Sequence, residues 1–167
     1  MRIWRVGQEH FMSFADGDSE GPLAAVGDAG DQTGTEIKFF PSPETLTHIE
    51  FDFATLEHRL RELAFLNSGI KLVLTDARGV DPNVVVLEYE GGIEAFVEHL
   101  DRGKTSLIGS PIAISGESNS VSVELALEWS DSYHETMLCF TNTIPQGDGG
   151  THLAGFRGAL TRTINSY

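Results

Sequence analysis

The sequence predicts an α+β fold, because segments with the period of a strand and segments with the period of a helix both occur along it. Between Val121 and Trp129, apolar residues alternate with Ser, Glu and Ala, as in a half-buried strand. Residues 52–67 carry apolar side chains three and four positions apart, as on one face of a helix. At 167 residues, the chain can bury one substantial core or two small ones.

The first fifty residues are predicted to form strands separated by a long loop. Gly7-Gln8 is typical of the tight turn of a β-hairpin. Residues 15–34 are rich in Gly, Asp and Ser, which indicates a mobile surface loop. The expected strands are residues 3–6, 10–14 and 35–40, with a short edge segment at 23–26.

The middle of the chain predicts a helix followed by a hairpin. Asp52 or Thr55 can open the helix, and the Asn67-Ser-Gly69 sequence is a suitable C-cap. Residues 70–75 and 84–89 then indicate two strands joined by a polar turn.

Gly91-Gly92 marks the most plausible domain boundary. Beyond it the pattern predicts a short helix around residues 93–100, a strand at 111–114, the strand of residues 121–129 and a returning strand at 133–143.

The chain ends in a glycine-rich loop and a helix that begins near Thr151, a suitable N-cap. Such a loop can offer backbone N–H groups to an anion, and it is equally an ordinary connection from strand to helix. Its glycine spacing fits neither a P-loop nor a dinucleotide turn. On the helix, Arg162 lies opposite the apolar stripe and Arg157 lies at its border. The stripe consists of Leu153, Phe156, Leu160, Ile164 and Tyr167.

Composition restricts the possible functions. The formal net charge is −14, which opposes broad nonspecific binding to nucleic acid, so any contact with DNA would be local and made by a few arginines. No apolar run approaches membrane-spanning length, and the N-terminus lacks the apolar core of a signal peptide. The single cysteine, Cys139, suits a buried thiol in a reducing compartment, and we expect a cytoplasmic protein.

The pattern reveals no complete active site. No two of the six histidines have the spacing of metal ligands, and no serine lies in a G-x-S-x-G turn. We therefore predict no catalytic residue and no metal ligand in this chain.

Four short motifs occur in the same order as in a known family, and together they are more specific for that family than any one of them alone. They are Thr33-Gly-Thr35 before a strand, residues 59–69 (RLRELAFLNSG), residues 89–93 (YEGGI) and residues 149–157 (GGTHLAGFR). Over essentially its whole length, the chain resembles the B subunit of DNA gyrase, or of its paralogue topoisomerase IV, among the type IIA DNA topoisomerases. The resemblance implies that residues 1–88 are the C-terminal half of a GHKL-type ATPase domain. It implies that residues 89–167 are the N-terminal part of a transducer domain with a ribosomal-protein-like fold.

The resemblance also implies an internal fragment. The family places its general base, its Mg²⁺-binding asparagine and its ATP lid upstream, and its transducer lysine downstream. ATP and Mg²⁺ would thus belong to the intact subunit, and we expect the isolated fragment to be inactive and to bind neither tightly.

Three residues match functional positions of the family, and a fourth, Ile37, is placed by its two-residue spacing from one of them. Thr35 matches a residue that contacts adenine, and Ile37, two residues further on, would line the apolar adenine slot. Arg5 matches an arginine at the rim of the ATP pocket, where aminocoumarin inhibitors bind in the family. Arg157 matches an arginine that faces the DNA cavity of the B-subunit dimer, which favours a phosphate-facing role for it.

In the family, ATP binding closes a dimer gate around DNA, and the transducer relays the nucleotide state to the parts that cleave DNA. The implied partners are DNA, the gyrase A subunit and a second B subunit, with no membrane. The alternative is a non-enzymatic paralogue that keeps the scaffold and binds a partner. A third hypothesis is a fragment that associates through an exposed sheet edge.

Overall fold

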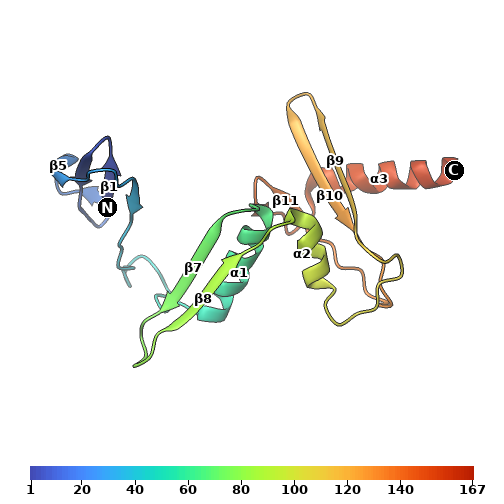
Figure 1. Cartoon of the computed structure of the whole chain (residues 1–167), viewed down its shortest axis with the longest axis horizontal. Coiled ribbons are helices and arrows are strands. Elements are labelled where there is room, and N and C mark those ends of the chain that lie inside the picture. Colours follow the sequence, from blue (N-terminus) through green and yellow to red (C-terminus); the bar gives the residue numbers. More distant parts are fainter. The chain divides into compact units, whose positions relative to one another are not determined.

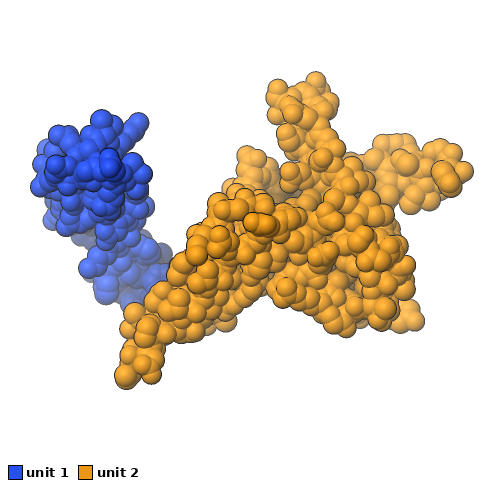
Figure 2. Space-filling view, in the orientation of Figure 1, with its two compact units in different colours: residues 1–51 blue, residues 52–167 orange.

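The computed structural model describes all 167 residues and confirms the α+β class, with helices and antiparallel sheets in one chain. The chain divides into two compact units, residues 1–51 and 52–167, which Figure 2 colours separately. The predicted boundary between residues 88 and 89 lies inside the second unit. The resemblance to a known family, and not a division into compact units, predicts the boundary between residues 88 and 89, so the domain assignment stays a prediction.

The first unit contains a four-stranded antiparallel sheet with strand order β5-β2-β1-β6. The predicted hairpin is confirmed as β1 and β2, with its turn at Val6 and Gly7, one residue earlier than expected. Both turn residues have a left-handed backbone (φ 53° and 73°), which explains the glycine there. The strands of the sheet are β1 (Arg2–Arg5), β2 (Gln8–Phe11), β5 (Ala24–Asp28) and β6 (Gly34–Glu36).

Two expectations for this unit need correction. Residues 15–34 are not one loop, because β4 (Asp18–Ser19) pairs with β3 (Phe14–Ala15) in a tight hairpin, and because β5 pairs with β2. The predicted edge segment at 23–26 is confirmed as part of β5, which is an edge strand of the sheet. The predicted strand at residues 35–40 ends at Glu36, because β1, its partner, begins at Arg2 opposite Glu36.

The second unit begins with α1 (Phe53–Leu66), whose predicted limits are confirmed. The Asp52 carboxylate accepts hydrogen bonds from the Thr55 backbone N–H at 2.7 Å and the Thr55 hydroxyl at 2.6 Å, which caps the helix. Thr55 thereby holds the pKa of Asp52 below its usual value. The predicted hairpin follows as β7 (Lys71–Asp76) and β8 (Asn83–Glu88), and both strands contact α1 (Figure 1).

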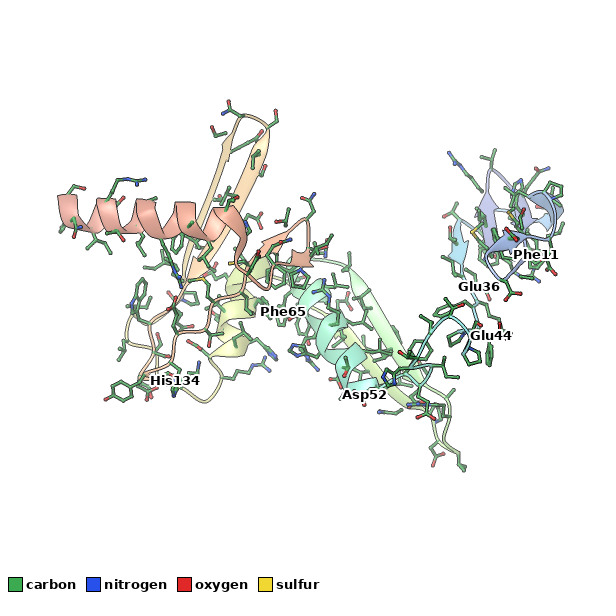
Figure 3. The ribbon with its side chains drawn as sticks, turned by 180° about the vertical axis from the view of Figure 1, so that it is seen from behind. Phe11, Glu36, Glu44, Asp52, Phe65 and His134 are labelled. Atoms are coloured by element: carbon green, nitrogen blue, oxygen red, sulfur yellow. The ribbon has the colours of Figure 1, made fainter.

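An aromatic cluster joins α1 to α2 (Gly92–Leu100). Phe65, labelled in Figure 3, is only 2% exposed and lies at the centre of the cluster. Its ring stacks on Tyr89 with centroids 3.8 Å apart and on Phe96 at 5.2 Å. The other fully covered hydrophobic residues of the chain are Ala64, Leu87 and Phe96.

Beyond α2, strands β9 (Ile112–Ser118) and β10 (Val121–Leu127) form a regular hairpin. The predicted strand at residues 133–143 is wrong. Only Phe140–Thr141 is a strand, β11, and it pairs with β12 (Ile144–Pro145). The segment after β10 instead returns along residues 105–107, where the Leu107 N–H donates to the Trp129 carbonyl at 2.7 Å. Residues 133–139 themselves form no strand.

The last helix, α3 (Gly150–Ser166), is present as predicted, but its N-cap is Gly149 and not Thr151. Gly149 has a left-handed backbone (φ 78°) and, as a glycine, offers no side chain to cap the helix. None of the residues of α3 is fully buried. No helix of the chain combines the length and apolar character that crossing a membrane requires.

Candidate functional site

The pairing register of the first unit brings two of the predicted site residues onto one face of its sheet. Ile3 and Arg5 are two residues apart on β1 and therefore point to the same side. Ile3 lies opposite Thr35 on β6 and opposite His10 on β2, and Arg5 lies opposite Gln8. Residues directly opposite each other share a face. Arg5 and Thr35 thus face the same way, although thirty positions of sequence separate them.

This face carries an open hollow of about 400 Å³. Its lining combines the apolar side chains of Ile3 and Leu23 with the polar groups of Arg5, Gln8 and His10. Thr35 shares the face but is not part of the lining. A surface that pairs apolar area with a guanidinium and an imidazole can contact a flat heterocycle and an anion together.

Arg5 is the cation available on this face. Its side chain makes no hydrogen bond or ion pair within the chain, whereas Arg2 on the opposite face is engaged twice. Arg2 pairs with Glu9, and its guanidinium carbon lies 5.2 Å from the centre of the Phe11 ring. The two arginines of β1 therefore differ, because only Arg5 keeps its donors free.

Ile37 lies just beyond the end of β6 and is 71% exposed. The alternation that would align it with Thr35 holds only within a strand, and the strand ends at Glu36. Ile37 begins an exposed apolar run that includes Phe39 and Phe40. The structure thus places Ile37 directly after β6, in a segment without a pairing partner.

Arg157 lies on α3, in the second unit. Its Nη2 donates to Glu135 Oε1 at 2.9 Å, and the two side chains are 55% and 65% exposed. An ion pair this exposed contributes little to stability. A phosphate could therefore replace Glu135 as the partner of Arg157 at small cost.

The glycine-rich loop before α3 can now be assigned. The Gly150 N–H donates to Asp148 Oδ1 at 3.1 Å, so a carboxylate of the chain already occupies this end of the helix. The loop serves as a connection, and the anion-binding alternative has no support here. Residues 149–167 contain no acidic side chain, so α3 is a basic segment of an acidic chain.

Sequence reasoning missed Ile3 and His10 as neighbours of Arg5. Once the turn is placed at Val6 and Gly7, the register alone brings them together. The side chains also include no group of three or more His, Cys, Asp or Glu residues able to hold a metal ion.

Comparison with known proteins finds similarity to B subunits of DNA gyrase. The family model for DNA gyrase B matches residues 92–167. The chain is 57% identical to the DNA gyrase B subunit of Caulobacter vibrioides over 99% of its own length and 22% of that protein. It is 53% identical to the DNA gyrase B subunit of Rickettsia bellii, over 100% of its length and 21% of that protein. The chain thus spans about a fifth of the length of these curated relatives.

Two solved structures are similar. The 43K ATPase domain of Thermus thermophilus gyrase B, crystallised with an aminocoumarin, is 36% identical with a TM-score of 0.81, covering 99% of this chain and 45% of that one. The B-subunit of the DNA gyrase from Myxococcus xanthus, at 23% identity and a TM-score of 0.78, covers 95% of this chain and 46% of that one. The second likeness supports the fold alone.

Proposed function

We infer that the chain belongs to the DNA gyrase B family, and we propose that it supplies one wall of the ATP pocket and the beginning of the transducer in an ATP-dependent, DNA-supercoiling topoisomerase. The observation that carries this proposal is the likeness to a gyrase B ATPase-domain structure across 99% of the chain. In the proposal, residues 1–88 belong to the GHKL-type ATPase domain and residues 89–167 to the transducer. The intact protein would act in the cytoplasm with DNA, the gyrase A subunit and a second copy of itself.

Three residues of the first unit would face the nucleotide. The Thr35 hydroxyl can donate and accept, which suits a water-bridged contact with adenine. Ile37 would cover the flat face of the base, and Arg5 would stand at the rim. The shared sheet face of Arg5 and Thr35 and the free guanidinium of Arg5 support this assignment. The proposal gives the residues of this chain no role in holding Mg²⁺.

Arg157 would face DNA phosphates from the basic helix α3. Its pairing with an exposed glutamate leaves it free to exchange partners, which supports the assignment.

A chimera tests the pocket wall. The matching region of the Caulobacter vibrioides gyrase B protein is replaced by this chain, and ATP hydrolysis is measured with gyrase A and DNA. We expect an active chimera in which Thr35→Val raises the KM for ATP about fivefold, the value of one hydrogen bond. Thr75→Val, at an exposed threonine of strand β7, is the matched control and should leave the KM unchanged.

Two results would contradict the proposal. If Thr35→Val and Arg5→Ala both leave the KM unchanged in an active chimera, these residues do not line the pocket. A folded chimera without any ATPase activity would favour the non-enzymatic module instead. The isolated chain should show no measurable ATP binding by calorimetry, and micromolar affinity would refute the expectation that most of the pocket lies outside it.

A further inference from the structure

The start of α3 follows a small hairpin, and farther along the helix Arg157 pairs with Glu135. No other helix or strand packs against α3, which extends away from the rest of its unit (Figure 1). The chain enters α3 directly from the hairpin β11–β12. The Gln146 N–H donates to the Cys139 carbonyl at 2.7 Å, and the Gly149 N–H donates to the Gln146 carbonyl at 3.0 Å. Whatever holds the hairpin therefore also holds the start of α3.

Arg59 of α1 holds this hairpin. Its Nη2 donates to the Thr143 carbonyl at 2.8 Å, across 84 positions of sequence. Its Nη1 donates to Glu62 Oε2 at 2.7 Å, which fixes the guanidinium on the surface of α1. The Arg59 side chain is 34% exposed and that of Glu62 is 14% exposed, so this pair is better shielded from water than the Arg157–Glu135 pair.

The acceptor lies in a strained turn. Asn142 and Thr143 have left-handed backbones, with φ of 48° and 68°. A β-branched residue rarely adopts this conformation, because its side chain crowds the backbone there. Such a conformation persists only where surrounding contacts hold it. The hydrogen bond from Arg59 is one such contact, and it binds the strained residue itself.

A second contact fastens the same hairpin to the aromatic cluster. The rings of Phe140 on β11 and Phe96 on α2 lie 6.4 Å apart and are tilted by 52°. Phe96 in turn stacks on Phe65 of α1. The hairpin thus meets the helical core through one polar contact and one aromatic contact. Of the two, the polar contact has a defined direction and distance.

We propose that Arg59 is a positioning residue, which fastens the β11–β12 turn to α1 and thereby sets where α3 begins. The positioning itself concerns only the second unit. A wider consequence rests on the proposed function: Arg59 would join the ATPase segment to the transducer segment, as part of the path that relays the nucleotide state.

The single cysteine of the chain provides a local reporter. The Cys139 carbonyl accepts from Gln146 at the base of the hairpin, and the residue is partly buried. In the whole chain, Arg59→Ala should speed the reaction of this thiol with an aromatic disulfide reagent about 3- to 10-fold, the range for loss of one hydrogen bond. Amide hydrogen exchange at residues 140–150 should accelerate to a similar degree, while the β9–β10 hairpin keeps its wild-type rates.

Arg61→Ala is the matched control. Arg61 lies on the same helix, and its guanidinium donates to Tyr89 Oη at 2.5 Å and also to Glu57. This variant removes an arginine of similar exposure without touching the hairpin. It should therefore leave the Cys139 rate at the wild-type value.

Arg59→Lys separates charge from geometry. Lysine keeps the positive charge beside Glu62 but has one nitrogen, which cannot reproduce two separate donors. We expect a Cys139 rate between those of the wild type and Arg59→Ala. Full rescue by lysine, an unchanged rate in Arg59→Ala, or faster exchange throughout the second unit would each overturn the proposal. None of these measurements requires ATP or DNA, so their failure is distinguishable from failure of the gyrase assignment.

Discussion

Helices α1 and α3 have similar apolar stripes in the sequence but very different surroundings in the structure. Ala64 and Phe65 of α1 are fully buried, whereas α3 has no buried residue and its Ile164 is 62% exposed. The period of the stripe shows which face of a helix is apolar. Whether another element covers that face depends on the rest of the fold.

The two helices also begin differently. Asp52, the N-cap of α1, accepts hydrogen bonds from Thr55, whereas the N-cap of α3 is a left-handed glycine without a side chain, and only Asp148, outside the helix, accepts from the Gly150 N–H. Most helices in proteins gain their stability from packing. We therefore expect α1 to resist perturbation of its local contacts, and α3 to depend on the hairpin that precedes it.

The largest expected effect is the difference between the buried Phe65 of α1 and the half-buried Phe156 of α3. Phe65→Ala should lower the free energy of unfolding by about 3–5 kcal/mol, because it leaves a cavity in the aromatic cluster. Phe156→Ala in α3 should cost less than about 1.5 kcal/mol, because its ring is only half-buried. Urea denaturation measures both. Equal losses would show that α3 is packed in solution as firmly as α1.

A smaller effect should appear in the pH dependence of the free energy of unfolding, through a histidine that packs against α1. His99 of α2 lies against Phe65, with ring centroids 5.2 Å apart, and its Nδ1 is buried without a hydrogen-bond partner. Burial lowers the pKa of His99 below its usual 6.5, and Arg102, Arg61 and His58 lower it further. Because the unfolded chain binds this proton more readily, stability should fall as the pH drops below about 6.5.

His99→Gln tests the origin of this pH dependence. Unfolding midpoints of the variant, measured by denaturation between about pH 5 and 8, should vary less with pH than those of the wild type. His152→Gln on α3 serves as the control and should keep the wild-type slope. An unchanged slope in His99→Gln would assign the effect to another group.

The smallest effect is expected at the exposed end of α3. Ile164→Ser should change the free energy of unfolding by less than about 0.5 kcal/mol, because the side chain has few contacts to lose. Light scattering of the purified wild-type chain should give the mass of a monomer. A large loss of stability in Ile164→Ser, together with a dimeric wild type, would show that a second copy covers the apolar stripe.

Much of the fold could be predicted because local signals agreed with pairing. The cap at Asp52 and the apolar spacing of α1 fixed that helix at both ends. Strand β10 alternates apolar residues with Ser, Glu and Ala, as predicted, although it pairs with β9 and not with the segment that follows it. Residues 133–143 and 35–40 have strand-forming composition as well, but most of each segment has no pairing partner in the structure.

The candidate site was only partly accessible to prediction. Arg5 and Thr35 could be selected by resemblance, yet no local pattern shows that they share a sheet face. That depends on the pairing of β1 with β2 on one side and with β6 on the other. The contact of Arg59 with Thr143 is less predictable still, because it joins a helix to a turn 84 residues later.

The amino-acid sequence alone determined the α+β class, the three helices and their apolar faces, the β1–β2 and β7–β8 hairpins, and the similarity to gyrase B subunits. These depend on side-chain periodicity, on caps and turn residues, and on motifs that stand close together in the chain. The tertiary structure decided which apolar faces are covered, where β6 and β11 stop, and that Arg59 reaches the hairpin before α3. Those outcomes depend on which distant segment supplies the facing surface or hydrogen-bond partner, and no local pattern contains that information.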